Sequence, residues 1–239
     1  KAAAAFSGGT DSAFLLWAAR EYGCQVQAYY VKTAFQPAFE LEDAQALAQA
    51  LSIPLTVLEL DIFSCPEAVA NGPDRCYFCK RTLFTQLWSR ARRDGHTLLL
   101  DGTNASDDAG DRPGMRALRE LEVRSPLREC GVTKDQVRRL SREAGLFTWD
   151  KPAYACLATR VPTGTAVTPE ALQRVENAEN ILFKMGFSDF RIRLLGKNAL
   201  LQLPESQMDR LLPRRAEILE RLKPCFSKLY LDLEARHGQ

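Results

Sequence analysis

A short glycine-containing turn near the N-terminus constrains the fold of this 239-residue chain more than any other segment. The turn, Ser7-Gly8-Gly9-Thr10-Asp11-Ser12, follows the apolar run Ala2–Phe6, which is typical of a strand, and precedes apolar residues at helical spacing. Two glycines let the backbone turn tightly and approach a ligand closely. The first N–H groups of the helix then attract anions, phosphate above all. The alternative is an ordinary turn in which Asp11 and Ser12 cap the helix.

Residues 1–160 alternate strand-like and helix-like segments. Strands are predicted at 25–31, 55–60 and 97–101, and helices at 41–51 and 79–93. This alternation predicts an α/β fold, a parallel sheet with helices on both faces. A ligand site is then expected at the carboxyl ends of the strands.

The pattern changes after the linker-like stretch 161–165. Thr168 is a suitable N-cap and Pro169 a suitable first-turn residue for a helix reaching Met185. Strands at 190–195 and 199–203, a helix at 205–221 and a strand at 226–233 follow. We therefore expect two domains, residues 1–160 and a small α+β domain of residues 161–239.

Composition argues against several classes of protein. Only two histidines occur, His96 and His237, which argues against a Ser-His-Asp hydrolase or a His-ligated metalloenzyme. The formal charge of +2 gives no sign of a nucleic-acid partner, and no apolar run approaches the ~20 residues of a membrane helix. Seven cysteines, an odd number, suggest reduced thiols in a cytoplasmic protein, so a cysteine cluster would indicate metal or sulfur chemistry.

The turn at 7–12 also resembles a known motif. Ser-Gly-Gly-Thr-Asp-Ser matches the SGGxDS loop of the ATP pyrophosphatases, the PP-loop superfamily related to the adenine nucleotide alpha hydrolases. The resemblance implies that Ser7, Gly8, Gly9, Asp11 and Ser12 hold the pyrophosphate portion of ATP. Asp11 could also position the Mg²⁺ ion that accompanies the phosphates.

Further motifs narrow the resemblance. In chain order they are Asp74–Lys80 with its CxxC, Asp101–Asp108, Arg112-Pro113-Gly114, Arg124–Leu127, Trp149–Pro152, Ala155–Arg160 and Phe190–Arg193. Together these motifs resemble the LarE family of ATP-dependent sulfur transferases. The resemblance implies adenylation of the carboxylates of pyridinium-3,5-biscarboxylic acid mononucleotide and their conversion to thiocarboxylates, a step in nickel-pincer nucleotide synthesis. It also implies a homo-oligomer and pathway partners that carboxylate the substrate and insert nickel.

Three cysteines carry the sulfur chemistry in this interpretation. Cys156 corresponds to the sulfur-bearing cysteine of the family, although a free cysteine is often only a small buried apolar residue. Cys76 and Cys79 could be half of a zinc site or a redox pair. The resemblance implies instead that the three thiols hold a 4Fe-4S cluster, whose open iron could carry the sulfide. The alternative is a sacrificial Cys156 that becomes dehydroalanine. Lys151 and Arg160 lie close in sequence and could favour the Cys156 thiolate.

The resemblance assigns the substrate to the C-terminal residues. Arg191 and Arg193 alternate on a predicted strand and so face one side of the sheet, where the family binds the phosphate of the mononucleotide. Arg160 and Thr159 are expected to share this task, and Glu179 to face the same site. Plain solvated surface is the alternative for the strand arginines and for Glu179, and is what we expect of Arg90, Arg92 and Arg93.

Other functions fit the motifs less well. A tRNA thiolase shares the loop, but usually adds a basic RNA-binding surface. An amide-forming ligase would leave the three thiols unexplained, and a non-catalytic metal-binding module would leave the SGGxDS loop unexplained.

Overall fold

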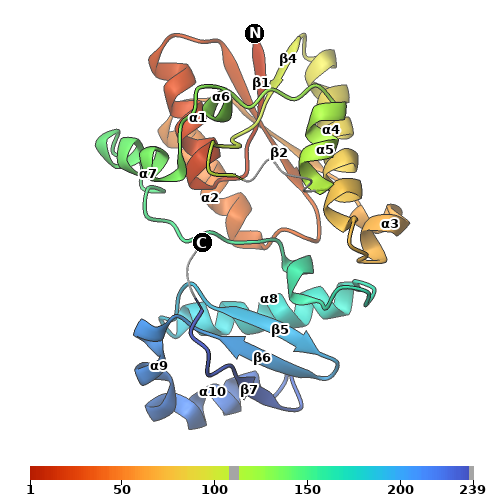
Figure 1. The fold of residues 1–239 in the computed structure, drawn as a ribbon, viewed down its shortest axis with the longest axis vertical. Helices are drawn as coiled ribbons and strands as arrows, with labels where there is room; N and C mark the ends of the chain where they lie inside the picture. The colour runs from red at the N-terminus through yellow and green to blue at the C-terminus, as the bar shows by residue number, and fades with distance from the viewer. Residues whose placement is uncertain (108–112, 237–239) are drawn as a thin grey trace. The chain divides into compact units, whose positions relative to one another are not determined.

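A computed structural model describes residues 1–107 and 113–236 of the chain (Figure 1). Residues Asp108, Arg112 and His237, which the motifs and composition had singled out, lie outside this described part. The chain divides into two compact units: the first comprises Lys1–Ala68 and Asp74–Lys151, and the second comprises Val69–Pro73 and the residues from Pro152 onward. This division differs from the predicted one in residues 69–73 and 152–160. The assignment of nucleotide and substrate to separate domains stays a prediction.

A four-stranded parallel sheet forms the centre of the first unit, as predicted. Its strands are β1 (Ala2–Ala5), β2 (Val26–Lys32), β3 (Leu55–Glu59) and β4 (Leu98–Leu100), in the order β3-β2-β1-β4. The chain therefore reverses its direction of travel across the sheet at β1, whose neighbours are β2 and β4. Such a switch point leaves a crevice at the carboxyl ends of the two central strands, where ligands bind in this class of sheet.

Alternation along the strands produces two separate cores. Tyr30 and Leu100 point into one core, whereas their neighbours Tyr29 and Leu99 point into the other. Figure 1 shows α1 (Thr10–Glu21), α2 (Ala38–Ala50) and α7 (Lys134–Glu143) on one face of the sheet and α4 (Arg75–Arg93) on the other. The remaining helical segments of this unit are η1 (Ile62–Ser64), α3 (Pro66–Val69), α5 (Pro113–Glu120) and α6 (Pro126–Glu129). No helix in the described ranges has both the length and the apolar character needed to cross a membrane.

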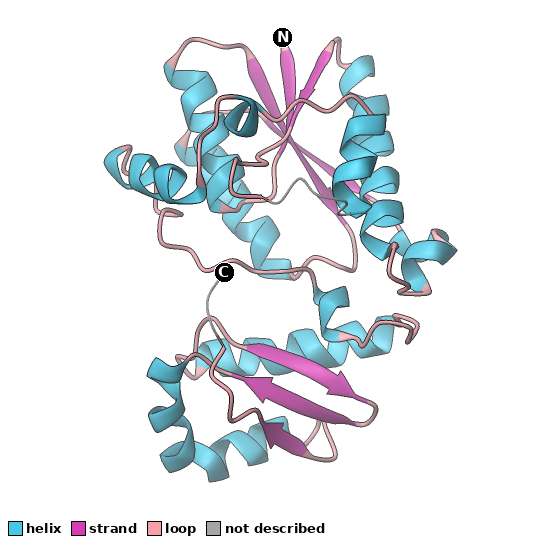
Figure 2. Cartoon of the chain, in the orientation of Figure 1, coloured by secondary structure: helices cyan, strands magenta, loops and turns pink. Residues whose placement is uncertain are grey.

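The second unit is a three-stranded mixed sheet with helices, drawn in magenta and cyan in Figure 2. Strands β5 (Arg191–Leu195) and β6 (Asn198–Gln202) pair antiparallel, and β7 (Leu229–Leu231) joins β6 in parallel. The helical segments are η2 (Leu157–Arg160), α8 (Pro169–Lys184), α9 (Glu205–Leu211), η3 (Leu212–Arg214) and α10 (Arg215–Leu222). A small α+β unit is thus confirmed.

Local signals account for where the elements of this unit begin and end. Thr168 caps α8 as predicted, accepting a hydrogen bond from the Ala171 N–H. The single helix predicted at 205–221 is wrong, because Pro213 lies at the interruption between α9 and α10. Proline lacks an N–H and its ring clashes with the preceding turn, so a regular helix does not continue through it.

The segment Val69–Pro73 connects two parts of the first unit but packs with the second. Asn71 is fully buried and has a left-handed backbone conformation, with φ of 57°. Its side-chain amide donates to the carbonyl oxygens of Pro162 and Thr165, each at 2.9 Å, and to that of Val161 at 3.3 Å. The Gly164 N–H donates back to the Asn71 carbonyl oxygen at 2.9 Å. Asn71 therefore fastens the 69–73 segment to the loop that precedes α8.

Candidate functional site

The loop between β1 and α1 has the geometry of an anion site. Gly9 is the N-cap of α1 and contributes no side-chain cap to the first turn. The Gly9 N–H donates to Ser7 Oγ at 3.4 Å, and Ser7 Oγ lies 3.1 Å from Ser12 Oγ. Two hydroxyls and the N-terminal N–H groups of a 12-residue helix thus gather at one point. The positive end of the helix dipole at this point favours a negatively charged ligand.

Glycine is required at two positions around this loop. Gly8 has φ of +72°, and a Cβ there would lie 3.0 Å from the Glu40 carbonyl oxygen and 3.1 Å from the Ala44 nitrogen. A Cβ on Gly102, which follows β4, would lie only 2.7 Å from the Ser12 nitrogen. The loops after β1 and β4 therefore touch through their backbones at the carboxyl edge of the sheet.

Asp11 has two polar partners from distant segments. Lys134 Nζ, at the first position of α7, lies 2.5 Å from Asp11 Oδ2. The Asn104 side-chain amide donates to Asp11 Oδ1 at 3.2 Å. Sequence reasoning missed Lys134. The only local signal was the capping box of Thr133 and Gln136, which marks the start of α7 but not its neighbours.

Lys151 also contacts the loop between β1 and α1. Its Nζ donates to the Gly8 carbonyl oxygen at 3.1 Å and to Asp43 Oδ2 at 2.6 Å. Its charge is thus directed at the loop in the first unit, whereas sequence reasoning had considered it a partner for Cys156, which belongs to the second unit.

Cys76 and Cys79 lie near the start of α4. The prediction that the helix begins at Cys79 is wrong, because α4 begins at Arg75 with Asp74 as its N-cap. The spacing of three residues puts both thiols on one side of the helix. Cys76 is exposed and Cys79 half-buried, and the Arg75 guanidinium lies 3.8 Å from the Cys76 sulfur.

Cys156 is the N-cap residue of η2 in the second unit and is half-buried. The Thr159 hydroxyl donates to the Cys156 carbonyl oxygen and accepts from Arg160 Nη1, both at 2.8 Å. The predicted residues Cys156, Thr159 and Arg160 therefore form one hydrogen-bonded turn.

Arg160 and Glu179 form a buried ion pair beneath this turn. Their side chains are 1% and 2% exposed, and Arg160 Nε lies 2.8 Å from Glu179 Oε1. Glu179 also accepts from the Tyr154 hydroxyl and from the Ile192 N–H. Burial lowers the pKa of Arg160, but Glu179 outweighs it and the pKa is raised overall. Glu179 thus joins α8, β5 and the segment around Cys156, and it faces Arg160 and not open solvent.

Arg191 and Arg193 of β5 both contact the segment that carries Cys156. Arg191 donates to the Phe190 and Ala153 carbonyl oxygens. Arg193 Nη1 donates to the Thr159 carbonyl oxygen at 3.1 Å. Arg191 is buried, whereas Arg193 is exposed. The structure thereby brings the two predicted strand arginines to both ends of the 153–159 segment.

The electrostatics around Arg191 favour an anion. Burial, together with the positive charges of Arg160 and Arg236, lowers the pKa of Arg191 to about 10, and the opposite effects of Glu179 and Asp189 are smaller. Arg236 lies 2.8 Å from Asp189, and Arg191 is 4.0 Å from the same carboxylate.

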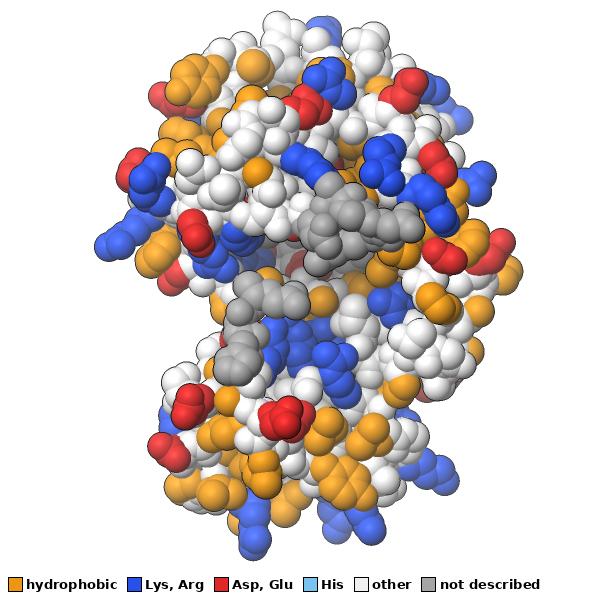
Figure 3. Space-filling view, in the orientation of Figure 1, with side chains coloured by type: hydrophobic (Ala, Val, Ile, Leu, Met, Phe, Trp, Pro, Cys, Tyr) orange, Lys and Arg blue, Asp and Glu red, His pale blue; other side chains and the backbone are white. Residues whose placement is uncertain are grey.

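Arg193 adds to this excess of positive charge. Although Arg193 is exposed overall, its partial burial and the charges of Arg160 and Arg236 lower its pKa. The cluster therefore contains four arginines and only two carboxylates, Glu179 and Asp189, and so carries a net positive charge. The arginines are Arg160, Arg191, Arg193 and Arg236. Figure 3 shows Lys and Arg side chains gathered on the surface of this unit. An arginine cluster of this kind is suited to a phosphate group.

No group of three or more His, Cys, Asp or Glu side chains within residues 1–107 and 113–236 is arranged to hold a metal ion. The three predicted cluster ligands are divided between the units, with Cys76 and Cys79 in the first and Cys156 in the second. Nothing in the described structure assigns a role to the other four cysteines, Cys24, Cys65, Cys130 and Cys225.

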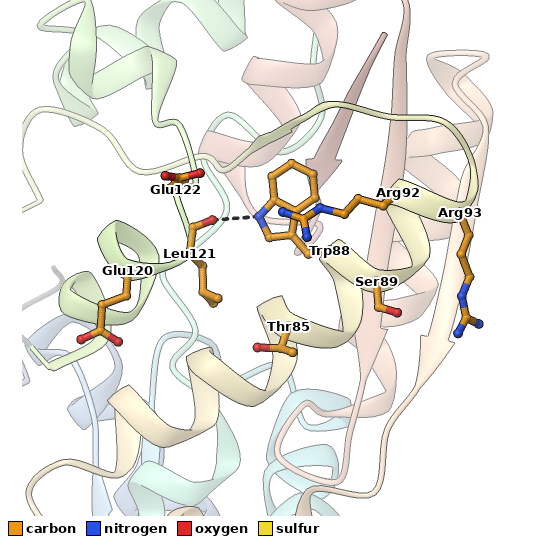
Figure 4. Close-up of a pocket in the computed structure, with 8 residues that line it drawn as sticks. All are labelled: Thr85, Trp88, Ser89, Arg92, Arg93, Glu120, Leu121 and Glu122. Atoms are coloured by element: carbon orange, nitrogen blue, oxygen red, sulfur yellow. Dashed lines mark hydrogen bonds between the residues drawn. The ribbon is translucent and has the colours of Figure 1, made fainter.

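A separate pocket lies between α4 and the end of α5 (Figure 4). The Trp88 indole N–H donates to the Leu121 carbonyl oxygen at 2.8 Å, and the Arg92 guanidinium lies over the Trp88 ring. None of the predicted site residues lines this pocket. Its arginines, Arg92 and Arg93, are those expected to be plain surface.

Comparison with known proteins adds to this geometry. The family "Queuosine biosynthesis protein QueC" matches residues 1–70, which include the loop between β1 and α1. An uncharacterised protein of Synechocystis sp. is 39% identical over 211 residues, 87% of this chain and 78% of that protein. An uncharacterised protein of Methanocaldococcus jannaschii is 27% identical over 231 residues, 96% of this chain and 88% of that protein.

A third relative has a named activity. The pyridinium-3,5-bisthiocarboxylic acid mononucleotide synthase of Lactiplantibacillus plantarum is 32% identical over 206 residues, which cover 85% of this chain and 75% of the synthase. The similarity therefore covers most of the chain. The chain therefore belongs to the LarE family, the family of this synthase.

Proposed function

We propose that this protein is an ATP-dependent sulfur transferase that converts the carboxylates of pyridinium-3,5-biscarboxylic acid mononucleotide to thiocarboxylates. The observation that carries the proposal is the 32% identity to a synthase of the bisthiocarboxylic acid mononucleotide. An anion-binding loop in the first unit and an arginine cluster beside Cys156 in the second supply the two phosphate sites that such a reaction needs.

ATP is proposed to bind with its pyrophosphate portion at the loop formed by Ser7, Gly8, Gly9, Asp11 and Ser12. A substrate carboxylate oxygen attacks the α-phosphorus, the bond to the β-phosphate breaks, and pyrophosphate leaves. The carboxylate is a poor electrophile, but the resulting acyl adenylate has AMP as a good leaving group. The loop N–H groups and the α1 dipole stabilise the negative charge that develops on the departing pyrophosphate.

Asp11 is the proposed protein ligand for Mg²⁺. Magnesium usually binds one or two carboxylates together with substrate phosphates, so one carboxylate beside a phosphate loop fits its chemistry. The ion would neutralise charge on the phosphates. We further propose that Lys134, which pairs with Asp11, contacts a phosphate oxygen when the carboxylate binds Mg²⁺.

The mononucleotide phosphate is proposed to bind at Arg191 and Arg193. The buried pair of Arg160 and Glu179 acts through its neighbours: it holds Thr159 and β5 in place. Arg160, Thr159 and Glu179 are still proposed to line the same substrate site.

Sulfur is proposed to come from the site that contains Cys156. Cys76, Cys79 and Cys156 are the right donors for a 4Fe-4S cluster, since thiolates are the usual ligands and the CxxC pair lies on one side of α4. When bound, the cluster would supply the sulfide from its open iron. Because the cysteines belong to two units, a shared cluster requires one particular placement of those units. The Arg160 charge favours a thiolate at Cys156 in either sulfur mechanism.

The reaction is tested by mixing anaerobically purified protein with ATP and the dicarboxylate mononucleotide. We expect AMP, pyrophosphate and thiocarboxylate product, measured by chromatography and mass spectrometry, only when both substrates are present. Asp11→Asn should sharply reduce pyrophosphate release, whereas the exposed Asp150→Asn should not. Consumption of ATP that depends on tRNA and not on the mononucleotide would favour a tRNA thiolase instead.

Iron analysis and intact mass of the same sample, before and after turnover, separate the two sulfur mechanisms. A cluster predicts brown protein with about four irons per chain, and loss of iron when Cys76, Cys79 or Cys156 is changed to alanine. Cys225→Ala should keep its iron. Iron-free protein that turns over once and gains dehydroalanine at position 156 would show that Cys156 is sacrificed.

A further inference from the structure

The last four residues of the first unit, 148–151, are fastened to the loop between β1 and α1. The Thr10 hydroxyl donates to the Thr148 carbonyl oxygen at 2.7 Å, and both residues are buried. Lys151 Nζ donates to the Gly8 carbonyl oxygen at 3.1 Å. Residues 8 and 10 of the loop are thus each tied to this one segment, about 140 residues away in sequence.

Lys151 holds the loop from a fixed position. Its Nζ is 2.6 Å from Asp43 Oδ2 on α2, and its side chain is only 19% exposed. The ammonium group also lies 5.8 Å from the centre of the Phe39 ring. Gly8 also packs closely against α2, because a Cβ on it would lie 3.0 Å from the Glu40 carbonyl oxygen. Lys151 therefore holds the Gly8 carbonyl oxygen while it is itself anchored to α2 through Asp43.

A second helix of the same unit fixes the backbone of this segment. Arg138 of α7 donates to the Trp149 carbonyl oxygen at 3.1 Å and to the Lys151 carbonyl oxygen at 3.2 Å. The same helix carries Lys134, the partner of Asp11. The loop and the 148–151 segment therefore share their supports, α2 and α7.

The chain leaves the first unit directly after Lys151, and Cys156 follows five residues later. We propose that Lys151 is a positioning residue that couples the nucleotide in the loop to the segment carrying Cys156. The inference rests on the proposed function, which places ATP phosphates at this loop and sulfur chemistry at Cys156.

The physical basis is the negative charge that bound nucleotide adds near Lys151. Without nucleotide, the ammonium group is balanced by Asp43 and one carbonyl oxygen. Phosphates at the loop bring additional negative charge close to Lys151, and this charge attracts the ammonium group more strongly to the loop. A ligand that binds one arrangement more tightly shifts the population toward it. Bound nucleotide therefore holds residue 151 more firmly and restricts the residues that follow it, Cys156 among them.

A purely structural ion pair would contribute stability without this dependence on nucleotide. The test therefore uses the alkylation rate of Cys156, measured by peptide mass spectrometry, with and without saturating α,β-methylene-ATP. This analogue keeps the phosphates and resists the proposed cleavage. In the wild-type protein we expect the analogue to slow alkylation by about five-fold or more, the lower end of ordinary coupling between sites.

In Lys151→Met the analogue should still bind at higher concentration, with the affinity reduced roughly 10- to 150-fold by loss of a charge-assisted contact. Once bound, it should leave the alkylation rate unchanged. Lys151→Arg should recover part of the effect, because it keeps the charge. Asp150→Asn, an exposed neighbour on the same segment, should behave as wild type.

Three results would overturn the inference. Saturated Lys151→Met that shows the wild-type slowing would remove Lys151 from the coupling. Wild-type protein that binds the analogue with no change at Cys156 would show that there is no coupling, and would leave the proposed function standing. Wild-type protein that does not bind the analogue would overturn the phosphate-loop assignment and this inference together.

Discussion

At the scale of single residues, Arg191 is a buried, positively charged side chain. It donates hydrogen bonds to two main-chain carbonyl oxygens, which carry no full negative charge. Burial and two neighbouring arginines lower its pKa to about 10. The protonated form is therefore disfavoured by the fold at every pH below about 10, and this cost is relieved as the pH rises above about 10. A bound phosphate would raise the pKa of Arg191, because its negative charge stabilises the protonated guanidinium.

This electrostatic balance predicts a pH dependence of ligand binding. The affinity for a pyridine mononucleotide, such as nicotinic acid mononucleotide, should fall as the pH rises through about 10, where Arg191 loses its charge. Titration calorimetry on both sides of this pH measures the effect. Arg191→Gln should bind roughly 10- to 150-fold more weakly at neutral pH and lose the step near pH 10. An unchanged step in this variant would assign it to another group.

At the scale of secondary-structure elements, two helices begin with the same device in different units. Thr133 caps α7 and accepts from the Gln136 N–H, while Thr168 caps α8 and accepts from the Ala171 N–H. The cap of α7 also sets the position of Lys134, the partner of Asp11. The cap of α8 belongs to the second unit.

The pair provides a matched experiment. Thr133→Ala and Thr168→Ala should each lower the free energy of unfolding by about 1 kcal/mol, the usual cost of losing an N-cap. Only Thr133→Ala should also weaken ATP binding, because the first turn of α7 holds Lys134. Urea denaturation of both variants measures the free energy of unfolding, and nucleotide titration measures the ATP affinity. Equal nucleotide affinity in the two variants would show that α7 does not position the loop.

Elements with strong local signals were predictable from the sequence. Thr168 and Pro169 fixed the start of α8, and alternation of strands and helices indicated the parallel sheet. Boundaries without such signals were missed. The start of α4 at Arg75 has no side-chain cap, and the break at Pro213 could be read only by giving the proline more weight than the apolar pattern.

The candidate site divides in the same way. Residues inside motifs, such as Arg191 and Cys156, were identified by resemblance to a family. Lys134 was missed because its contact with Asp11 joins residues 123 positions apart, and no local pattern encodes such a pair. Tyr154 was missed for a similar reason: its hydroxyl reaches Glu179 only through the packing of the second unit.

At the scale of the whole molecule, the chain passes between the two units three times, after Ala68, after Pro73 and after Lys151. Two of these passages lie next to cysteine motifs, because Cys76 follows Pro73 by three residues and Cys156 follows Lys151 by five. Three residues of chain span at most about 11 Å, so the CxxC turn is tethered closely to a segment of the second unit.

Asn71 should be the residue on which this tether depends. Asn71→Ala removes an amide that donates to three carbonyl oxygens, and should cost about 1–3 kcal/mol for the buried acceptors left without it. Hydrogen exchange of the 161–167 amides should speed up accordingly. Ser52→Ala is the control, because Ser52 also has a positive φ but is exposed. Equal effects of both changes would attribute the loss to backbone conformation alone.

The loop of residues 69–73 has a consequence for how this protein can be divided or recombined. A single cut at the junction after Lys151 does not separate the units, because five residues from the earlier part of the chain stay embedded in the second one. A chimera that exchanges only the residues from Pro152 onward would bring a foreign surface to the native Asn71. Successful exchange of the second unit between relatives should therefore require residues 69–73 to be exchanged with it, as one discontinuous module.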